Sequence, residues 1–571
     1  MSRATIVEYN KIIGEEPLAL PIYLSGISRQ KLLSLGAHFL GFNPKNEKNL
    51  DYEAFLDNFF SPENSQFKDA MHDKLLKFHE AVGTPILIVN TVSSLEFFQF
   101  VFSRPDQPET QQLVEMEQNI FRAYLSINQE TRSKEDKVLP SVKGISIDEA
   151  LPAAFFTQSF AYSNLINFEL SELVTSQLIK AVFLFDFLSQ TDKTKILYQA
   201  FLDYFKLQKG TDYLVRLFSF IHGIITNQKE GYVDFVVPGG DKFERDCEFI
   251  EKLIMAEGSM ADADDFINIR ERPFYRIDKG KYRIVFSLFV IEKVFKSLYF
   301  TLKSINESLE KENRVKGLRP LLTEELSEKI IVYEILNSIY KKNYITYTGK
   351  DLRDLDVTAE PDYYLRKGKR IFLFESKDFL IEAGIKTSYD YSRIRPKLEQ
   401  NFLKDDKGKK AILQLLNTCE KILSKTFHPD VGYEEHKVII YPIVVVHDNQ
   451  YNVIGLNHIV NTWLNDELLN LKKRGVPTDL IRPLTIINID TLIYHQDLLR
   501  LRNVLLEDVI ERYITRCSLQ NVRYKSENHR IDVLQKRMNP FSHFFNEDPI
   551  VIAKNSAPCM LKDKVGILLK N

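Results

Sequence analysis

Residues 360–378 read EPDYYLRKGKRIFLFESKD and contain the pattern that decides the fold. Two runs rich in aromatic and apolar residues, 362–366 and 370–376, predict two β-strands, and the Lys367-Gly368 pair between them predicts a tight turn. The second run is apolar on both faces until its end, which is typical of a strand that is buried in a sheet. The stretch therefore predicts a β-hairpin whose second strand lies inside a domain core.

The register of this hairpin brings three charged side chains together. With a two-residue turn at 367–368, Asp362 faces Leu373 and lies diagonal to Glu375, roughly 7–8 Å away along the backbone. Lys377 alternates onto the same face. Because two carboxylates at short range repel each other and lose hydration on burial, the pair needs a cation or a shared proton.

A hard divalent cation supplies this compensation. Mg²⁺ binds one or two carboxylates, keeps several waters and takes phosphate oxygens as further ligands. It polarises a phosphoryl oxygen and lowers the pKa of a water, while a lysine orients or deprotonates that water. The three side chains therefore predict Mg²⁺-dependent hydrolysis of a phosphodiester, with Mn²⁺ as the alternative metal.

The sequence around the hairpin predicts an α/β domain. An amphipathic helix is predicted at 323–342, a second helix at 409–425, and strands at 438–446 and 484–489. The run at 438–446, VIIYPIVVV, is typical of a strand that is buried on both faces, but its Pro442 predicts an edge position or a bulge. We expect a mixed central sheet that is flanked by helices.

The motif and its flanks resemble the PD-(D/E)xK nuclease superfamily over about residues 320–450. Pro361-Asp362 is followed after a gap of twelve residues by Glu375-Ser376-Lys377, and the order of helix, hairpin, helix and strand is similar to the core of that family. The resemblance implies that Asp362 and Glu375 bind the metal and that Lys377 positions the attacking water. It also implies a third metal-binding acid on the preceding helix, Glu334, with Glu328 as the alternative.

A basic stretch at 386–410 follows the motif. It holds eight basic and four acidic residues with interleaved aromatic residues, as expected of a loop that contacts a phosphate backbone or an unstacked base. A solvated loop with a net charge of about +4 explains the composition equally well. The residues that we expect to bind nucleic acid are Arg393, Arg395, Lys397, Lys404, Lys409 and Lys410, together with Gln414 on the helix that follows.

The composition excludes several classes of protein. The 76 basic and 78 acidic residues nearly balance, which excludes a polybasic nucleic-acid coat but allows a local basic surface. The four cysteines form no CxxC pair, which argues against a disulfide scaffold or a zinc knuckle and favours a reducing compartment. Neither a secretory signal nor an uncharged spanning segment is evident, so we expect a cytoplasmic protein without membrane contact.

The chain is long enough for about three domains. We expect a mainly α-helical N-terminal domain at 1–315 for recognition, regulation or oligomerisation, a nuclease-like α/β domain at 316–500, and a helical or irregular C-terminal extension at 501–571. Apolar residues spaced by three and four predict helices in the first of these parts. These helices are expected at 67–82, 169–189, 193–207, 212–226 and 281–311.

The favoured function is a metal-dependent DNA endonuclease in restriction, antiviral defence or DNA repair. One alternative is a non-catalytic nucleic-acid-binding or interaction protein on a degenerate nuclease fold, and another is a nuclease directed at RNA. A second copy of the chain or a partner protein of a defence system stays open as a further partner. His447-Asp448 follows the apolar strand where α/β proteins collect ligands, and it is read either as a ligand site or as a strand-ending turn.

Overall fold

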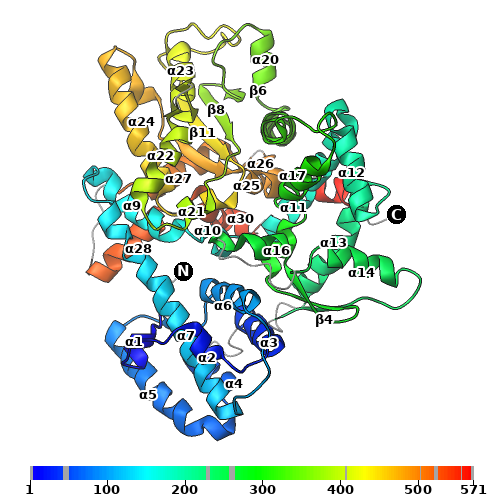
Figure 1. Ribbon diagram of the computed structural model, residues 1–571. Coiled ribbons are helices and arrows are strands. Elements are labelled where there is room, and N and C mark those ends of the chain that lie inside the picture. Colours follow the sequence, from blue (N-terminus) through cyan, green and yellow to red (C-terminus); the bar gives the residue numbers. More distant parts are fainter. Residues whose placement is uncertain are drawn as a thin grey trace. The chain divides into compact units, whose positions relative to one another are not determined.

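The computed structural model (Figure 1) describes residues 4–42, 51–226, 232–255, 264–405, 408–501, 503–519, 525–553 and 556–566. The chain forms two compact units, and each unit combines two separate stretches of sequence. The first unit contains residues 1–137 and 216–293, and the second contains residues 138–215 and 294–571. This division differs from the predicted boundary at residue 315, because part of the predicted N-terminal domain folds together with the α/β region.

The first unit is mainly helical. Strand β1 (Thr5–Ile6) pairs in parallel with β2 (Ile86–Leu87), and β3 (Asp234–Val236), β5 (Lys281–Ile284) and β4 (Phe274–Asp278) form an antiparallel sheet in that order. Its helices are α1 (Tyr9–Ile12), α2 (Leu20–Leu24), α3 (Arg29–Leu40), α4 (Asp51–Phe59), α5 (Ser65–Val82), α6 (Thr91–Ser103), α7 (Leu113–Glu135), α14 (Phe243–Glu251), α15 (Ile267–Glu271) and α16 (Ser287–Glu292).

The predicted long helix at 281–311 is wrong. Its first residues form β5, and α16 and α17 (Leu298–Ser308) follow as separate helices. The chain turns at Gly280, whose φ of +71° suits glycine, and β5 then pairs with a strand on each side. The apolar residues have helical spacing, but hydrogen bonds to a strand on each side stabilise the extended conformation more. These partner strands are not visible in the local sequence.

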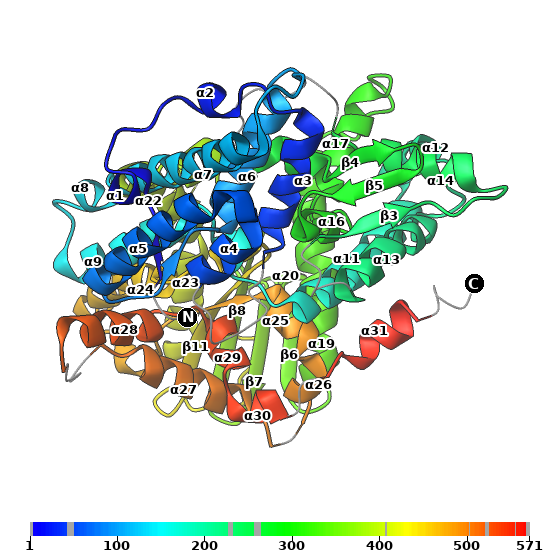
Figure 2. The same ribbon diagram turned by 90° about the horizontal axis from the view of Figure 1, so that it is seen from below.

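The second unit contains a mixed sheet, as predicted, with five strands in the order β12-β11-β8-β7-β6; the edge strand β6 was not among the predicted strands. Strands β8, β11 and β12 are parallel, whereas β7 and β6 are antiparallel to their neighbours. Figure 2 shows β6, β7, β8 and β11 from below. The bounds of the five strands are β6 (Ile345–Thr348), β7 (Tyr363–Lys367), β8 (Arg370–Lys377), β11 (Ile439–Val446) and β12 (Thr485–Asn488).

The second unit also holds a short antiparallel pair, β9 (Lys404–Asp405) and β10 (Gly408–Lys409), and many helices. Among the described residues, no helix combines the length and the apolar character that crossing a membrane requires. The predicted helices at 169–189, 193–207 and 212–226 correspond to α11, α12 and α13, and α5 corresponds to the one at 67–82. The helices of the second unit, with α13 at its boundary, are α8 (Val138–Ser141), α9 (Ile147–Phe160), α10 (Ser163–Ile166), α11 (Leu170–Gln190), α12 (Lys195–Phe205), α13 (Gly210–Thr226), α17, α18 (Leu318–Leu321), η4 (Leu322–Val332), α19 (Tyr333–Tyr340), α20 (Gly349–Asp354), α21 (Ala383–Lys386), α22 (Tyr391–Phe402), α23 (Ala411–Leu423), α24 (Leu456–Lys473), α25 (Ile489–Tyr494), α26 (Gln496–Leu499), α27 (Leu506–Cys517), α28 (Glu527–Arg537), α29 (Phe541–Asn546), α30 (Pro549–Ala553) and α31 (Cys559–Lys564).

Pro442 lies on an inner strand, so the predicted edge position or bulge is wrong. The β8–β11 ladder runs without a shift past Pro442, which faces Leu373. On the other side of β11, the ladder with β12 begins only at Ile443. Because Pro442 precedes the ladder with β12, its missing N–H removes no hydrogen bond from that ladder. A proline is therefore tolerated inside the sheet.

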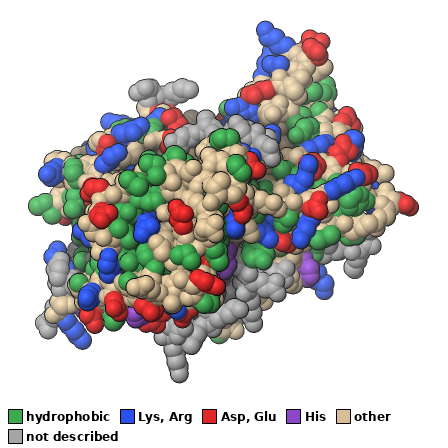
Figure 3. Space-filling model, turned by 60° about the horizontal axis from the view of Figure 1, so that its bottom comes forward, with side chains coloured by type: hydrophobic (Ala, Val, Ile, Leu, Met, Phe, Trp, Pro, Cys, Tyr) green, Lys and Arg blue, Asp and Glu red, His purple; other side chains and the backbone are tan. Residues whose placement is uncertain are grey.

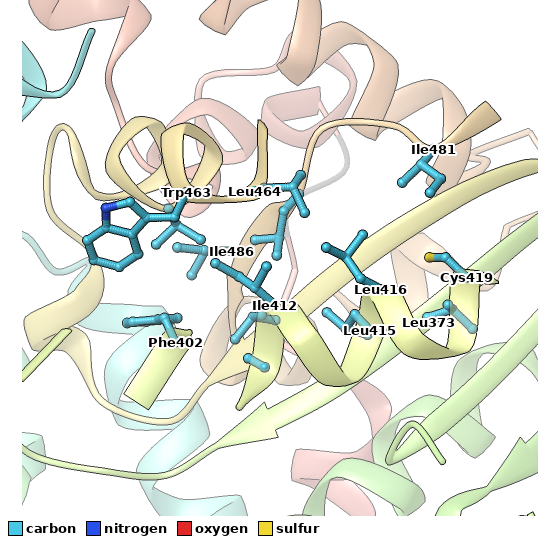
Figure 4. Close-up of a cluster of buried hydrophobic side chains, with 14 of the residues drawn as sticks. Leu373, Phe402, Ile412, Leu415, Leu416, Cys419, Trp463, Leu464, Ile481 and Ile486 are labelled. Atoms are coloured by element: carbon cyan, nitrogen blue, oxygen red, sulfur yellow. The ribbon is translucent and has the colours of Figure 1, made fainter. Parts of the chain in front are cut away.

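An apolar core fixes α23 against the sheet. Ile412, Leu415 and Cys419 of α23 are fully buried at helical spacing, and each fully buried aliphatic side chain contributes about 1.5–3 kcal/mol. Figure 4 shows this face of α23 together with Leu373 of β8 and Trp463 of α24, all of which belong to the same hydrophobic cluster. This packing holds α23 beside the end of β8 that carries the Glu-x-Lys motif.

His495, between α25 and α26, should make the stability of the protein depend on pH. Its Nε2 donates to Oδ1 of Asn546 at 2.8 Å, and burial lowers its pKa from 6.5 to about 4. Between these values the unfolded chain binds a proton that the native protein does not, so the free energy of unfolding falls as the pH decreases. We expect a loss on the order of 1 kcal/mol per pH unit, which His495→Gln removes.

Urea unfolding of both proteins between about pH 4.5 and 7 measures this difference. His447, whose pKa burial also lowers to about 4, contributes equally to both proteins and leaves a common slope. Identical slopes in the wild type and in His495→Gln would contradict the expectation.

Candidate active site

The hairpin of β7 and β8 places Asp362 beside Glu375. The turn includes Gly368, with a φ of +58°, and begins one residue later than predicted. Tyr363 therefore faces Phe374, and the same register extended by one residue sets Asp362 opposite Glu375 rather than diagonal to it. Because a shift of two residues leaves every side chain on its predicted face, the two carboxylates still share one face.

Hydrogen bonds fix the side chains of the motif. Asp362 Oδ2 accepts the backbone N–H of Ser376 at 2.6 Å. The Nζ of Lys377 donates to Oε1 of Glu375 at 2.8 Å and to Oε1 of Gln414 at 3.2 Å. Glu375 is 2% exposed, and its buried Oε2 finds no hydrogen-bond partner among the described residues. The structure thus brings together the predicted Asp362, Glu375, Lys377 and Gln414, and it leaves one buried carboxylate oxygen unsatisfied.

The electrostatics of the site disfavour two ionised carboxylates. Burial raises the pKa of Glu375 to about 8, and the charge of Asp362 adds to this shift while Lys377 opposes it. Burial likewise raises the pKa of Asp362. Burial would lower the pKa of Lys377, but the two carboxylates outweigh it and raise that pKa above its ordinary value. An additional cation would allow both acids to be ionised.

The acid on the preceding helix is Glu328 rather than Glu334. Glu334 is exposed on α19, outside the site. Glu328 lies in the π-helix η4, and its Oε1 accepts from the hydroxyl of Tyr333 at 3.4 Å. Burial and the charge of Asp362 raise the pKa of Glu328 to about 7. The wider π-helical turn changes which residues face the sheet, and α-helical spacing cannot predict this.

Arg353 is a residue of the site that the sequence reasoning missed. Its side chain is 43% exposed and donates to Glu360 at 2.7 Å, and its charge lowers the pKa values of Glu328 and Asp362. Thr348 forms a capping box with Asp351 that starts α20 and so places Arg353. The TGKD pattern at 348–351 is the sequence signal that could have located this helix.

The predicted basic loop contains the helix α22, and three of its cations are paired with acids. Arg393 and Lys404 are exposed, whereas the side chain of Lys409 lies outside the described residues. Figure 3 shows basic and acidic side chains interspersed over one face of the molecule. The paired residues are Arg395 with Glu149 at 2.8 Å, Lys397 with Glu382 at 3.3 Å and Lys410 with Asp405 at 3.0 Å.

Two neighbouring arginines of α22 should therefore behave differently on substitution. Arg395→Ala removes a guanidinium that binds both oxygens of Glu149, which is 3% exposed, and should lower the free energy of unfolding by about 1–3 kcal/mol. Arg393→Ala, at an exposed position, should change stability by less than about 0.5 kcal/mol. Denaturant unfolding measures both values, and equal losses would contradict a structural role that is specific to Arg395.

No protein-family model, no curated protein and no solved structure matches this chain. Within the described ranges, no group of three or more His, Cys, Asp or Glu side chains is placed to hold a metal ion. Mg²⁺, however, needs only one or two carboxylates because it keeps several waters. Asp362 and Glu375, with the unsatisfied Oε2 of Glu375, therefore fit the donor set of a Mg²⁺ ion.

Proposed function

We propose that this protein is a nuclease of the PD-(D/E)xK type that hydrolyses DNA phosphodiesters with a divalent cation. The observation that supports this function most is the convergence of Asp362, Glu375 and Lys377 at the end of an inner strand of a mixed sheet. Glu328 and Gln414 extend the same polar group. Such an activity would serve restriction, antiviral defence or DNA repair.

Each side chain has a distinct role in this proposal. Asp362 and Glu375 would hold Mg²⁺ or Mn²⁺, and the bound cation would polarise a phosphoryl oxygen and lower the pKa of a water. The ammonium of Lys377 has three hydrogens, and Glu375 and Gln414 accept two of them. No described residue accepts the third hydrogen, which would orient the attacking water, and the charge of Lys377 would offset the negative charge that develops in the transition state.

Arg353 would bind the substrate backbone. Its guanidinium is partly exposed and lies close enough to Glu328 and Asp362 to lower their pKa values. A guanidinium suits a phosphate because it donates two parallel hydrogen bonds. This local cation makes a basic surface unnecessary for substrate binding next to the carboxylates.

Incubation with polynucleotides tests the proposal. Supercoiled plasmid, linear DNA, single-stranded DNA and RNA are compared with Mg²⁺, with Mn²⁺ and with a chelator. We expect cleavage of DNA that depends on the divalent cation and stops with the chelator. Cleavage of RNA alone would redirect the proposal to the RNA nuclease, and intact substrates under all conditions would refute nuclease activity.

A non-catalytic nucleic-acid-binding protein on the same fold is the second candidate. The ion pair between Lys377 and Glu375 favours it, because this pair already neutralises one carboxylate without a metal. Calorimetric titration with Mg²⁺ and Mn²⁺ separates the two candidates. A binding site that Glu375→Gln removes supports the nuclease, and no detectable binding supports the non-catalytic protein.

A further inference from the structure

A cavity of about 80 Å³, lined by both apolar and charged side chains, lies at the carboxyl end of the parallel strands of the second unit. Asp378 after β8, His447 and Asp448 after β11, and Asp490 in the first turn after β12 line it. Open α/β sheets bind ligands in this position, beyond the carboxyl ends of their strands. Asp378 directly follows Lys377 and alternates to the opposite face, so this cavity is separate from the carboxylate site.

Three cations line the cavity, and each is paired with one of its aspartates. Burying ion pairs costs desolvation energy that apolar side chains of similar volume would avoid, so stability alone does not explain them. Two of the cations, Lys296 and Arg319, keep 23% and 32% of their side chains exposed. The pairs are Arg319 with Asp378 at 2.6 Å, Lys296 with Asp448 at 3.1 Å and Lys180 with Asp490 at 2.6 Å.

An exposed aromatic ring stands beside these cations. Phe300 of α17 lines the cavity with 53% of its surface exposed, and the guanidinium of Arg319 lies 5.2 Å from the ring centre of the neighbouring Tyr299. A base stacks on an aromatic face, and a phosphate binds ammonium and guanidinium groups. The carboxylates can accept hydrogen bonds from sugar hydroxyls or base amino groups, since ionised carboxylates only accept.

We propose that a nucleoside phosphate binds at the mouth of this cavity, with the phosphate at Lys296 and Arg319 and the base outside, against the exposed ring of Phe300. Binding of this kind goes beyond phosphodiester hydrolysis and does not require the carboxylate site. Two sources present the same chemistry, which are a free mononucleotide and the terminal nucleotide of a strand.

Calorimetric titration of the full chain without divalent cations tests the proposal. AMP should bind at least about tenfold more tightly than adenosine or inorganic phosphate, because only AMP carries both recognised groups. Phe300→Ala should weaken AMP binding about tenfold, which corresponds to about 1.4 kcal/mol and lies within the range for base stacking. Since Phe300 is more than half exposed, the variant should keep its fold, which thermal unfolding checks.

Tyr204→Ala is the matched control, because Tyr204 belongs to the same unit, is 45% exposed and is not part of the cavity lining. This variant should bind AMP as the wild type does. A 5′-phosphorylated tetranucleotide separates the two sources. If it binds at least tenfold more tightly than AMP, the terminal nucleotide of a strand is the ligand, and a smaller difference identifies the free nucleotide.

Two results would overturn the proposal. One is the absence of binding by both AMP and the tetranucleotide, and the other is unchanged affinity for both in Phe300→Ala. The outcome is distinguishable from that of the nuclease proposal. AMP binding without DNA cleavage would refute only the nuclease, and DNA cleavage without nucleotide binding would refute only this cavity.

Discussion

Lys377→Ala should lower the initial rate of Mg²⁺-dependent plasmid cleavage about 10³-fold, since removing one group that stabilises the transition state costs rates of this order. The ammonium of Lys377 is held between Glu375 and Gln414, so the substitution removes both the donor to the water and the charge beside the phosphate. Asp362→Asn should lower the cleavage rate by the same order, because it removes a carboxylate that would hold the metal. The two variants differ in metal binding, which only Asp362→Asn should weaken.

Lys367→Ala is the matched control for Lys377→Ala, because Lys367 lies on the same hairpin and is exposed at the far end of β7. Its cleavage rate should equal that of the wild type. Glu328→Gln should lower the rate at least tenfold, whereas Glu334→Gln should not, because the charge of Asp362 acts on Glu328 while Glu334 is exposed on α19. A wild-type cleavage rate in Lys377→Ala would refute the proposed role of this lysine.

The sequence was sufficient for the part of the site that depends on local alternation. The parity of residues along β8 predicts that Glu375 and Lys377 share a face, and the Pro-Asp pair locates the partner strand. The turn begins one residue later than predicted, which changes the register of the hairpin but not the face of each side chain. The prediction that Asp362 and Glu375 share a face is therefore confirmed. Four strands of the mixed sheet were predictable because aromatic or apolar runs mark them, but β6 (Ile345–Thr348) was missed, since its sequence ITYT is partly exposed and forms no continuous apolar run.

The rest of the site depends on contacts that sequence patterns do not encode. The π-helical geometry of η4 places Glu328 near Asp362, and the spacing of residues in the sequence does not predict a π-helix. The pairing of Arg395 with Glu149 joins positions 246 residues apart, so a count of basic residues overestimates the charge that is free for nucleic acid. Pro442 is tolerated on an inner strand because of where β12 begins to pair, which the sequence of β11 does not contain.

Asp430→Ala should lower the free energy of unfolding of the second unit by about 3–5 kcal/mol, the range for removing one partner of a buried ion pair. Asp430, in the segment after α23, accepts from Nε and a terminal nitrogen of Arg366 at 2.5 and 3.0 Å. It also accepts from the hydroxyl of Tyr364 at 2.9 Å. Both partners belong to β7, so the substitution leaves an uncompensated guanidinium on the strand that leads from Asp362.

An exposed ion pair of the same unit provides the control. Lys472 and Asp479 lie 3.5 Å apart with 62% and 87% of their side chains exposed, and Asp479→Ala should cost less than about 1 kcal/mol. Chemical denaturation of both variants measures the contrast. Similar losses for Asp430→Ala and Asp479→Ala would show that burial of the Arg366 pair does not determine its energy.

A double-mutant cycle then separates the ion pair from the other contacts of Asp430. Arg366→Met leaves the carboxylate of Asp430 buried, with Tyr364 and the backbone N–H of Gly432 as its remaining donors among the described residues. Combined with Asp430→Asn, it removes both charges and should cost about 1–3 kcal/mol less than the sum of the single losses. Additive losses would mean that the two charges do not stabilise each other. Their contribution to β7 would then come from packing and from the Tyr364 hydrogen bond alone.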